Sequence, residues 1–536
     1  MALSQLVKLA DIKVRFMSAP KGLETIFSMM HAGNKKIKRA AMSVMRNLCT
    51  NDSTNALVIA RGGLRHLFGM LQKGLLVRSD YDIKSTAAEV IRNIANSNVN
   101  RELLMDSHVM RLCVMMLKAE FLEHEESVEM ALLDFVCAAA TAPANRVAMI
   151  KLGAAQVLIN KLNTQELLLS HIQVAVRCLL NLSYEKKTHE SLLGDQLLAM
   201  LIKVCYTEIP TRLGIQMVTE WDAEAPVVDD EETLASTLQT PRKFDYTKSP
   251  VHEIVRSCVM IVAEMSETPD CTQAVIDSTI VKPIIGASFS LFKADRKMAR
   301  DVSTIMRRLT DESRGDAVRC QSLTAYGVLD AAERMVLVND MRQKSAAVSS
   351  LAVLTDHINV THIVCKHAIV AELVAQGFIP EDVQPVVKLL TLVCEASEAL
   401  REMLLELGAV DVLMAALKDS WHRRERMDHV GHVLHALRIL GQYEVCRKQI
   451  VGGGVMKLLF RISRLQYHPG RTDAKKIING LGPEAAAFAI QIVVVNFVRN
   501  KRLSKMRSHM KQQVEASRKE RRMAAKVKVD PPAAAK

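Results

Sequence analysis

Two short clusters of histidine and cysteine side chains are the first candidates for chemistry in this chain. They are His429, His432 and His435, and His362, Cys365 and His367. Residues three apart share one face of a helix, so His429 and His432 could reach one metal ion. A zinc site requires four ligands in tetrahedral geometry, and neither cluster has a further Cys or carboxylate in an evident partner position. We therefore expect no metal ion and no cofactor.

Known catalytic motifs are missing from the sequence. Gly452, Gly453 and Gly454 form a glycine run, but it lacks the Lys-Ser/Thr pair of a phosphate-binding loop. The nucleophile elbow Gly-x-Ser-x-Gly, the zinc-protease motif His-Glu-x-x-His and the dinucleotide fingerprint do not occur either. We expect no catalytic residues and a non-enzymatic function.

A recurring segment must position the remaining polar side chains. Residues 40–49, 87–95 and 175–183 each start with small residues and carry an Asn near their end, after a turn and a short apolar helix. The turns recur from Gly22 to Gly63 after 41 residues, and from Gly63 to His108 after 45. The turn positions are Gly22, Gly63, His108, Gly153, Gly194, Ser278, Gly327, Ala368, Gly408 and Gly454. A period in the forties predicts a helical solenoid, in which each repeat buries its apolar stripe against its neighbours.

These turns and helices resemble the armadillo repeat family, whose unit is three helices of roughly forty residues. Residues 20–206 match best, and the turn-to-helix segments 153–159 and 408–414 are the clearest. The resemblance implies an all-α, right-handed solenoid, and the sequence adds a basic helix at the C-terminal end. From 250 to 465 the resemblance is weaker, so HEAT-type repeats remain open there. The comparable helices of that half end without the Asn, at Leu309, Leu354 and Leu440.

Five segments are expected along the chain. Residues 1–206 form an N-terminal armadillo-type array, and residues 251–465 form an armadillo- or HEAT-like array. Residues 207–250 are acidic and contain several prolines, which predicts a flexible insertion. Residues 466–483 contain two Pro and Gly pairs and are expected to be a linker, and residues 484–536 a capping helix with a basic tail.

Composition favours a cytoplasmic protein. The 11 Cys are scattered without a C-x-x-C pair, which is typical of reduced, buried thiols. The N-terminus has no signal-peptide pattern. The longest apolar candidate for a membrane helix, residues 485–498, is shorter than the roughly 20 residues that a span needs, so we expect no integral membrane association.

The third-helix Asn residues are Asn47, Asn93 and Asn181. The armadillo resemblance implies that they lie on the concave face and bond the backbone of an extended peptide. The alternative is that they bond a neighbouring repeat and only hold the solenoid together. The candidate groove also includes Arg46, Arg92 and Arg177.

The position four residues before each third-helix Asn bears on one armadillo function, that of a nuclear-import adaptor. Nuclear-import adaptors of the family place a Trp four residues before the Asn. Here that position holds Ser43, Glu89 and Arg177, and the two Trp lie elsewhere. An import-type adaptor is therefore the lowest-ranked alternative.

The C-terminal tail carries most of the net charge. Residues 499–536 contain 13 basic and 3 acidic residues, which accounts for +10 of the net +13. We expect an electrostatic arm made of Arg499, Lys501, Arg502, Lys505, Arg507, Lys511, Arg518, Lys519, Arg521 and Arg522. Basic amphipathic helices bind calmodulin-like proteins and other acidic surfaces such as tubulin. No aromatic residue follows Phe497 to stack bases, which argues against nucleic acid.

The sequence thus predicts a cytoplasmic scaffold or adaptor whose groove holds an extended or helical segment of another protein. The main alternative is a structural component of microtubules or cilia, held to the cytoskeleton by the basic helix. That alternative rests on analogy between folds.

Overall fold

The computed structural model describes residues 5, 8, 10–19, 21–76, 81–118, 125–164, 167–194, 196–204, 250–286, 295–379, 381–422, 427–465, 468 and 470–527. Every regular element among these residues is a helix, and none is a strand. The chain divides into two compact units, Met1–Val360 and Thr361–Lys536. The all-α prediction is confirmed.

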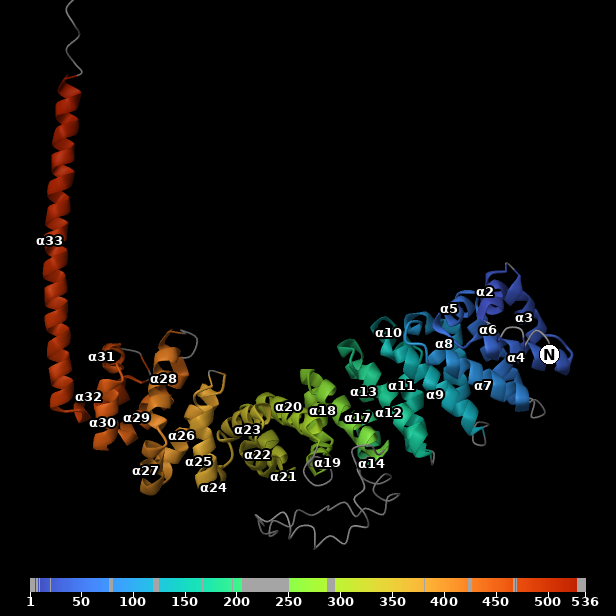
Figure 1. Cartoon of the computed structure of the whole chain (residues 1–536). Coiled ribbons are helices and arrows are strands. Elements are labelled where there is room, and N and C mark those ends of the chain that lie inside the picture. The colour runs from blue at the N-terminus through green and yellow to red at the C-terminus, as the bar shows by residue number, and fades with distance from the viewer. Residues whose placement is uncertain are drawn as a thin grey trace, which may run out of the picture. The chain divides into compact units, whose positions relative to one another are not determined.

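The first unit is built from repeats of three helices, stacked in chain order (Figure 1). The first helices of the repeats are α2 (Ala10–Ser18), α5 (Asp52–Ala60), η1 (Arg101–Leu104), α10 (Pro143–Lys151), η3 (Lys186–Thr188) with α13 (His189–Gly194), α18 (Pro269–Asp277) and α21 (Ala317–Ala325). The second helices are α3 (Gly22–Met30), α6 (Gly63–Leu76), α8 (Ser107–Lys118), α11 (Ala154–Thr164), α14 (Leu197–Lys203), α19 (Val281–Gly286) and α22 (Val328–Leu337).

The third helices form one continuous layer, because each packs on the next. They are α4 (Lys35–Leu48), α7 (Tyr81–Ala95), α9 (Glu126–Thr141), α12 (Leu169–Ser183), α17 (Pro250–Met265), α20 (Arg296–Glu312) and α23 (Met341–Leu354). Small buried residues such as Ala41, Ala87 and Ala131 let these helices approach closely. Their exposed and half-buried side chains make up what we call the third-helix face.

Local sequence fixes where these helices begin and end. Asn51 caps α5 by accepting a hydrogen bond from the Thr54 amide, and Asp340 caps α23 in the same way. The turns before the second helices α6 and α22 use the left-handed backbone conformation, which glycine adopts most easily. Gly62 has φ +77° and Gly327 has φ +86°.

Three predicted turn positions are displaced by one or two residues. The left-handed residues are Gly62, Gln196 and Thr279, where the sequence indicated Gly63, Gly194 and Ser278. Gly63 is needed for another reason, because a Cβ atom there would lie 2.4 Å from Val58 Cγ1. Gly62 thus provides the left-handed turn, and Gly63 provides space for the close approach of Val58. Periodicity alone does not distinguish these two roles.

The array continues across the predicted acidic insertion. Residues 205–249 lie outside the described residues, and Pro250 begins α17. α12 packs directly on α17, and Gln173 of α12 hydrogen-bonds to Glu253 of α17. The first unit therefore includes helices from both predicted arrays, and the division of the chain falls after Val360.

The second unit continues the helical pattern. Its elements are α24 (Thr361–Val364), α25 (His367–Gln376), α26 (Val383–Ala396), α27 (Glu398–Glu406), α28 (Ala409–His422), α29 (Met427–Leu440), α30 (Glu444–Gly452), α31 (Met456–Arg464), α32 (Arg471–Gly480) and α33 (Pro483–Val527). α26, α29 and α32 pack in succession. α32 lies within the stretch expected to be a linker. Its Ala474 and Ile477 are buried, so part of that stretch belongs to the core.

The thiols are free at all ten described cysteines, and nine of them are buried. No helix among the described residues has an apolar stretch long enough to cross a membrane.

Candidate functional site

The three predicted Asn residues lie on the third-helix face. Asn47, Asn93 and Asn181 are all half-buried, on α4, α7 and α12 respectively. α9, which separates α7 from α12, has no Asn in its sequence. The side chains thus sit on the same layer but do not form an unbroken row.

Asn181 already makes a contact between repeats. Its Nδ2 donates to the carbonyl oxygen of Cys137 on α9 at 3.4 Å and lies 3.7 Å from Cys137 Sγ. A side-chain amide has two N–H donors and a carbonyl oxygen, so these contacts do not exhaust its bonding capacity. Both predicted roles, holding the solenoid and holding a peptide, remain compatible with Asn181.

Arg308 makes the equivalent bond in the half of the chain that lacks the Asn. Its Nη1 donates to the carbonyl oxygen of Ala263 on the preceding third helix, α17. Arg308 stands directly before Leu309, which the sequence identified as the end of a helix without Asn. An arginine thus replaces the amide as donor, and the spacing from the donor to its acceptor is 45 residues against 44 for Asn181.

The predicted groove arginines are paired with acids one repeat later. Arg46 Nη1 lies 3.4 Å from Glu89 Oε2, and Arg92 Nε lies 3.0 Å from Asp134 Oδ2. Exposed pairs of this kind contribute between 0 and about 1 kcal/mol each. They hold the guanidinium groups in place on the third-helix face. The sequence analysis missed both acids, although spacings of 43 and 42 residues match the repeat.

Arg177 has a different partner. Burial opposes the charge of its guanidinium, but Cys137, Asp134 and Glu253 nearby raise the pKa of Arg177 above its usual value. The structure therefore brings together Arg177, Asn181 and Cys137, of which sequence reasoning identified only the first two.

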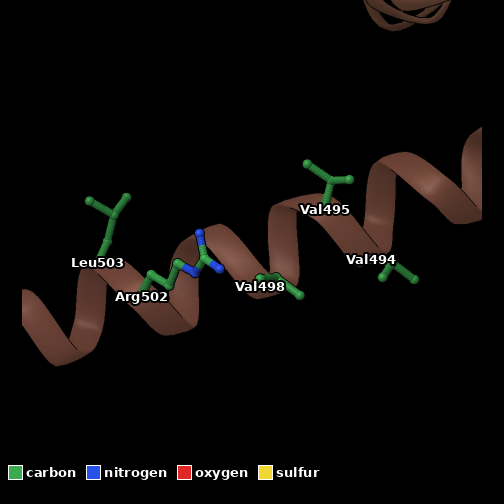
Figure 2. A pocket seen from close by; sticks show the side chains of 5 residues that line it. All are labelled: Val494, Val495, Val498, Arg502 and Leu503. Atoms are coloured by element: carbon green, nitrogen blue, oxygen red, sulfur yellow. The ribbon is translucent and has the colours of Figure 1, made fainter.

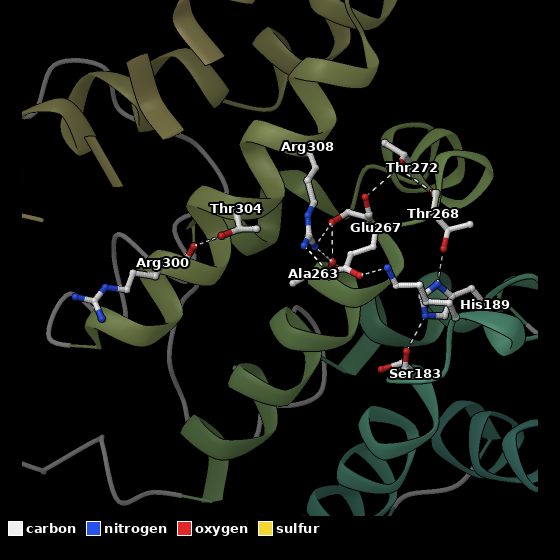
Figure 3. A network of polar contacts seen from close by, with 11 residues as sticks. Ser183, His189, Ala263, Glu267, Thr268, Thr272, Arg300, Thr304 and Arg308 are labelled. Atoms are coloured by element: carbon white, nitrogen blue, oxygen red, sulfur yellow. Dashed lines mark hydrogen bonds and ion pairs between the residues drawn. The ribbon is translucent and has the colours of Figure 1, made fainter. Parts of the chain in front are cut away.

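A polar network joins the α12 and α17 repeats near the start of α18 (Figure 3). His189 lies between Ser183 and Thr268: its Nε2 is 2.7 Å from the Ser183 carbonyl oxygen, and its Nδ1 is 2.7 Å from Thr268 Oγ1. Beside it, Glu267 binds Lys186 at 2.7 Å and also pairs with Arg308. These contacts connect residues that lie on either side of the predicted insertion.

Acid should weaken this network. Hydrogen bonding from Lys186 is the main cause that lowers the pKa of the Glu267 carboxyl, and Arg308 lowers it further. A carboxylate with a lowered pKa stabilises the fold above its unfolded pKa and loses that contribution as the pH falls through its folded value. The network is therefore complete at neutral pH.

One histidine of the two clusters contacts a carboxylate of the preceding repeat. No group of three or more His, Cys, Asp or Glu side chains within the described ranges is arranged to hold a metal ion. His435 instead pairs with Glu395 at 2.7 Å, one repeat earlier. This pair extends the pattern of contacts between repeats into the second unit.

The electrostatic arm lies on α33. The side chains of residues 501–520 are exposed, including the arm members Lys501, Arg502, Lys505, Arg507, Lys511, Arg518 and Lys519. The side chains of Arg499, Arg521 and Arg522 lie outside the described residues. Apolar side chains on the same helix are exposed too: Met506 is 63% and Met510 62% exposed.

A surface hollow of about 360 Å³ lies along α33, where the apolar part of this helix meets its basic part. Val494, Val495, Val498, Arg502 and Leu503 line it, and Figure 2 shows all five on successive turns of one helix. Neighbouring apolar and cationic side chains suit a ligand that is both acidic and amphipathic.

Comparisons with known proteins agree on the fold. No protein-family model and no curated protein sequence matches the chain, but solved structures do. One is an engineered protein of 14% identity, with a TM-score of 0.52 over 86% of this chain and 98% of the other. Another comes from work on a phosphorylation switch in the interaction between cadherin and beta-catenin. It has 13% identity and a TM-score of 0.52 over 89% of this chain and 99% of the other. The chain therefore has an armadillo-like α-solenoid fold, as predicted.

Proposed function

We propose that this armadillo-like solenoid is a non-enzymatic, cytoplasmic scaffold that holds a segment of a partner protein on its third-helix face. The observation that supports this most directly is the placement of Asn47 and Asn93. They are half-buried on consecutive third helices, and the ion pairs of Arg46 and Arg92 fix the surroundings.

The spacing of such amides suits an extended peptide. Packed helices lie 8–10 Å apart, and an extended chain advances about 3.3 Å per residue. One amide per helix would therefore meet roughly every third residue of the peptide. Backbone hydrogen bonds would position the chain, and the side chains between them would give specificity.

The amides should contribute to binding more than to stability. Changing Asn47 and Asn93 together to Ala should weaken a bound partner by about 0.5–1.5 kcal/mol per lost hydrogen bond. The melting temperature should stay within a few degrees. Affinity capture with the full chain as bait, followed by mass spectrometry, identifies the partner, and titration with that partner measures the loss.

Asn181 is left intact in this variant because it also bonds Cys137. The matched control changes Asn98 and Asn160 to Ala, since both are exposed and lie outside the third helices. A partner that loses affinity equally for both variants does not use the third-helix face. A large drop in melting temperature for the Asn47/Asn93 variant would instead assign these amides to the solenoid itself.

We propose further that α33 adds a contact with an acidic surface. The exposed Lys and Arg side chains of residues 501–519 support this, and microtubules are the acidic polymer with which to test it. A role in the cytoskeleton or in cilia would follow from such binding. A calmodulin-like protein is the other acidic partner that the exposed Met506 and Met510 suit.

Neutralising the arm should remove a salt-dependent contact. With Lys501, Arg502, Lys505, Arg507 and Lys511 changed to Gln, co-sedimentation with microtubules should weaken at least about tenfold at low salt. The Debye length falls from about 10 Å at 0.1 M salt to roughly 3 Å at 1 M, so the unmodified chain should lose the same contact at high salt. Circular dichroism should show an unchanged fold.

A control for this experiment keeps the charge and changes the residue. Lys at 501, 505 and 511 becomes Arg, and binding should be retained. Equal binding by the neutralised and unmodified chains at every salt concentration would show that the arm makes no electrostatic contact with tubulin.

A further inference from the structure

Five hydroxyl side chains of this chain closely follow a pair of basic residues. Protein kinases that select basic substrates recognise such a pattern, because acidic side chains in their substrate cleft attract Lys and Arg beside the hydroxyl. Each of the five has two Lys or Arg among the three residues before it: Thr188, Thr310, Ser345, Ser504 and Ser508. Such patterns are common in sequences, so accessibility decides which of these hydroxyls an enzyme can reach.

Neighbouring helices cover three of the five hydroxyls. Thr188 is 2% exposed and Thr310 is 0% exposed. The Thr310 hydroxyl also lies 3.1 Å from Ser350 Oγ on the next third helix, α23. Ser345 is half-buried, and Lys344 directly before it is only 8% exposed. A kinase would have to separate packed helices to reach any of these three covered hydroxyls.

Ser504 and Ser508 lie in a fully exposed part of α33. Every side chain of residues 501–520 is exposed, including both serines and the basic residues around them. Ser508 Oγ donates a hydrogen bond to the Lys505 carbonyl oxygen of its own helix at 2.7 Å. Opening the helix here breaks backbone hydrogen bonds but no packed core, so local opening costs little. This segment can therefore enter the cleft of a kinase.

The basic residues are placed symmetrically around the two serines. Each serine has one basic residue three positions before it and another three positions after it. These residues are Lys501 and Arg507 for Ser504, and Lys505 and Lys511 for Ser508. Residues three apart are neighbours on the surface of a helix. A phosphate on either serine would thus have a cation within reach on each side, and hydrogen bonds between ionised groups are among the strongest.

We propose that Ser504 and Ser508 are phosphorylation sites of a serine kinase that selects basic substrates. The serine hydroxyl oxygen attacks the γ-phosphorus of ATP, the bond from this phosphorus to the bridging oxygen breaks, and ADP leaves. The hydroxyl proton passes to the base of the kinase and then to solvent. A phosphatase reverses the change by hydrolysing the phosphate ester with water.

Phosphorylation would cancel most of the charge around the two serines. Residues 501–512 contain five basic residues and no acidic one, which gives a net charge of +5 with His509 neutral. Each phosphate carries a charge of about −1.5 to −2 at pH 7, so two phosphates would leave between about +1 and +2. Phosphorylation should therefore release α33 from an acidic surface. That consequence rests on the electrostatic contact proposed above, whereas the modification itself rests on exposure and sequence.

Site mapping on the folded full chain tests the proposal. The chain is incubated with magnesium ATP and the catalytic subunit of cyclic-AMP-dependent protein kinase, and in parallel with protein kinase C, since both select basic residues near the hydroxyl. Cleavage after glutamate releases Ser504 and Ser508 together in residues 485–515, and Thr310 in residues 268–312. Fragmentation of these peptides locates each phosphate. We expect Ser504 and Ser508 to be modified at least about ten times faster than the three covered hydroxyls.

Ser345 provides the matched control. Arg342 and Lys344 precede it, and the ten residues after it contain no acidic residue. A synthetic peptide of residues 341–350 presents the same pattern without the fold. This peptide should be phosphorylated, whereas Ser345 of the folded chain should not. The difference would show that burial, and not sequence, protects the covered hydroxyls.

Co-sedimentation with microtubules measures the consequence for binding. The doubly phosphorylated chain should bind at least about tenfold more weakly than the unmodified chain at low salt, where charges are least screened. Phosphatase treatment should restore binding. The variant Ser504→Ala/Ser508→Ala should keep its binding after incubation with either kinase, and circular dichroism should show an unchanged helix content.

Different results would overturn the two parts of the proposal. Absence of phosphate on both serines with either kinase, or modification of the covered hydroxyls at the same rate in the folded chain, would overturn the site. Equal microtubule binding by the phosphorylated and unmodified chains would overturn the release. If the unmodified chain does not bind microtubules, the electrostatic contact proposed for α33 fails, and site mapping still decides whether Ser504 and Ser508 are modified.

Discussion

Replacing Lys161 with Met should lower the free energy of unfolding of the first unit by about 3–5 kcal/mol. Lys161 of α11 forms an ion pair with Glu129 of α9, and their side chains are only 6% and 9% exposed. Removing one member of a buried pair leaves an uncompensated charge away from water, which typically costs this much. His171 would be the remaining partner, and its Nε2 lies 3.9 Å from Glu129 Oε2. Urea denaturation followed by circular dichroism measures the change.

The double variant Lys161→Met/Glu129→Leu is the decisive control. It removes both charges and leaves apolar side chains of similar size, so most of the lost stability should return. Equal destabilisation by the single and double variants would mean that packing, and not the unpaired carboxylate, causes the loss. Amide exchange should locate the weakened region at α9 and α11.

Replacing Phe135 with Ala should cost a similar amount for a different reason. Phe135 of α9 meets Phe68 of α6 edge to face, with ring centroids 4.9 Å apart, and both side chains are fully buried. A Phe-to-Ala change in a core removes buried apolar area and leaves a cavity, which together cost about 3–5 kcal/mol. The aromatic pair adds roughly 0.5–1.5 kcal/mol to what is lost. The urea midpoint and melting temperature measure the total.

Phe378 provides the comparison for this variant. It is 60% exposed, so Phe378→Ala should change stability by less than about 0.5 kcal/mol. Phe135→Leu should fall between the two, because it keeps most of the volume. A loss below about 1 kcal/mol for Phe135→Ala would show that the surrounding helices collapse into the space.

Repeat periodicity predicted the helices well because it depends on apolar spacing along one chain. The turn-to-helix unit at Gly153 and α11 is one example, and Gly408 with α28 is another. The helix α32 was harder to predict, because the glycines and prolines of residues 466–483 are typical of a loop. Ala474 and Ile477 give that helix too short an apolar stripe to stand out.

Sequence reasoning raised a contact between repeats for the Asn residues, but it missed the other side-chain contacts that join neighbouring repeats. The partner of Arg46 is Glu89, and nothing local to either residue indicates it. Arg308 replaces an Asn as donor, so a search for Asn alone overlooks it. Cys137 was missed because a single cysteine in an apolar helix is typical of the core, and its contact with Asn181 belongs to the next repeat. Whether the predicted groove residues bind a partner remains a prediction.

The direct packing of α12 on α17 has a consequence for protein engineering. α12 precedes residues 205–249 in the sequence and α17 follows them, and these two helices are held together by their own side chains. The entropic cost of closing a loop grows slowly, by roughly 0.6 kcal/mol for each doubling of its length. Sequence inserted between residues 204 and 250 should therefore cost the packed helices little stability. This position in the sequence offers an attachment point for a fluorescent reporter or a foreign domain.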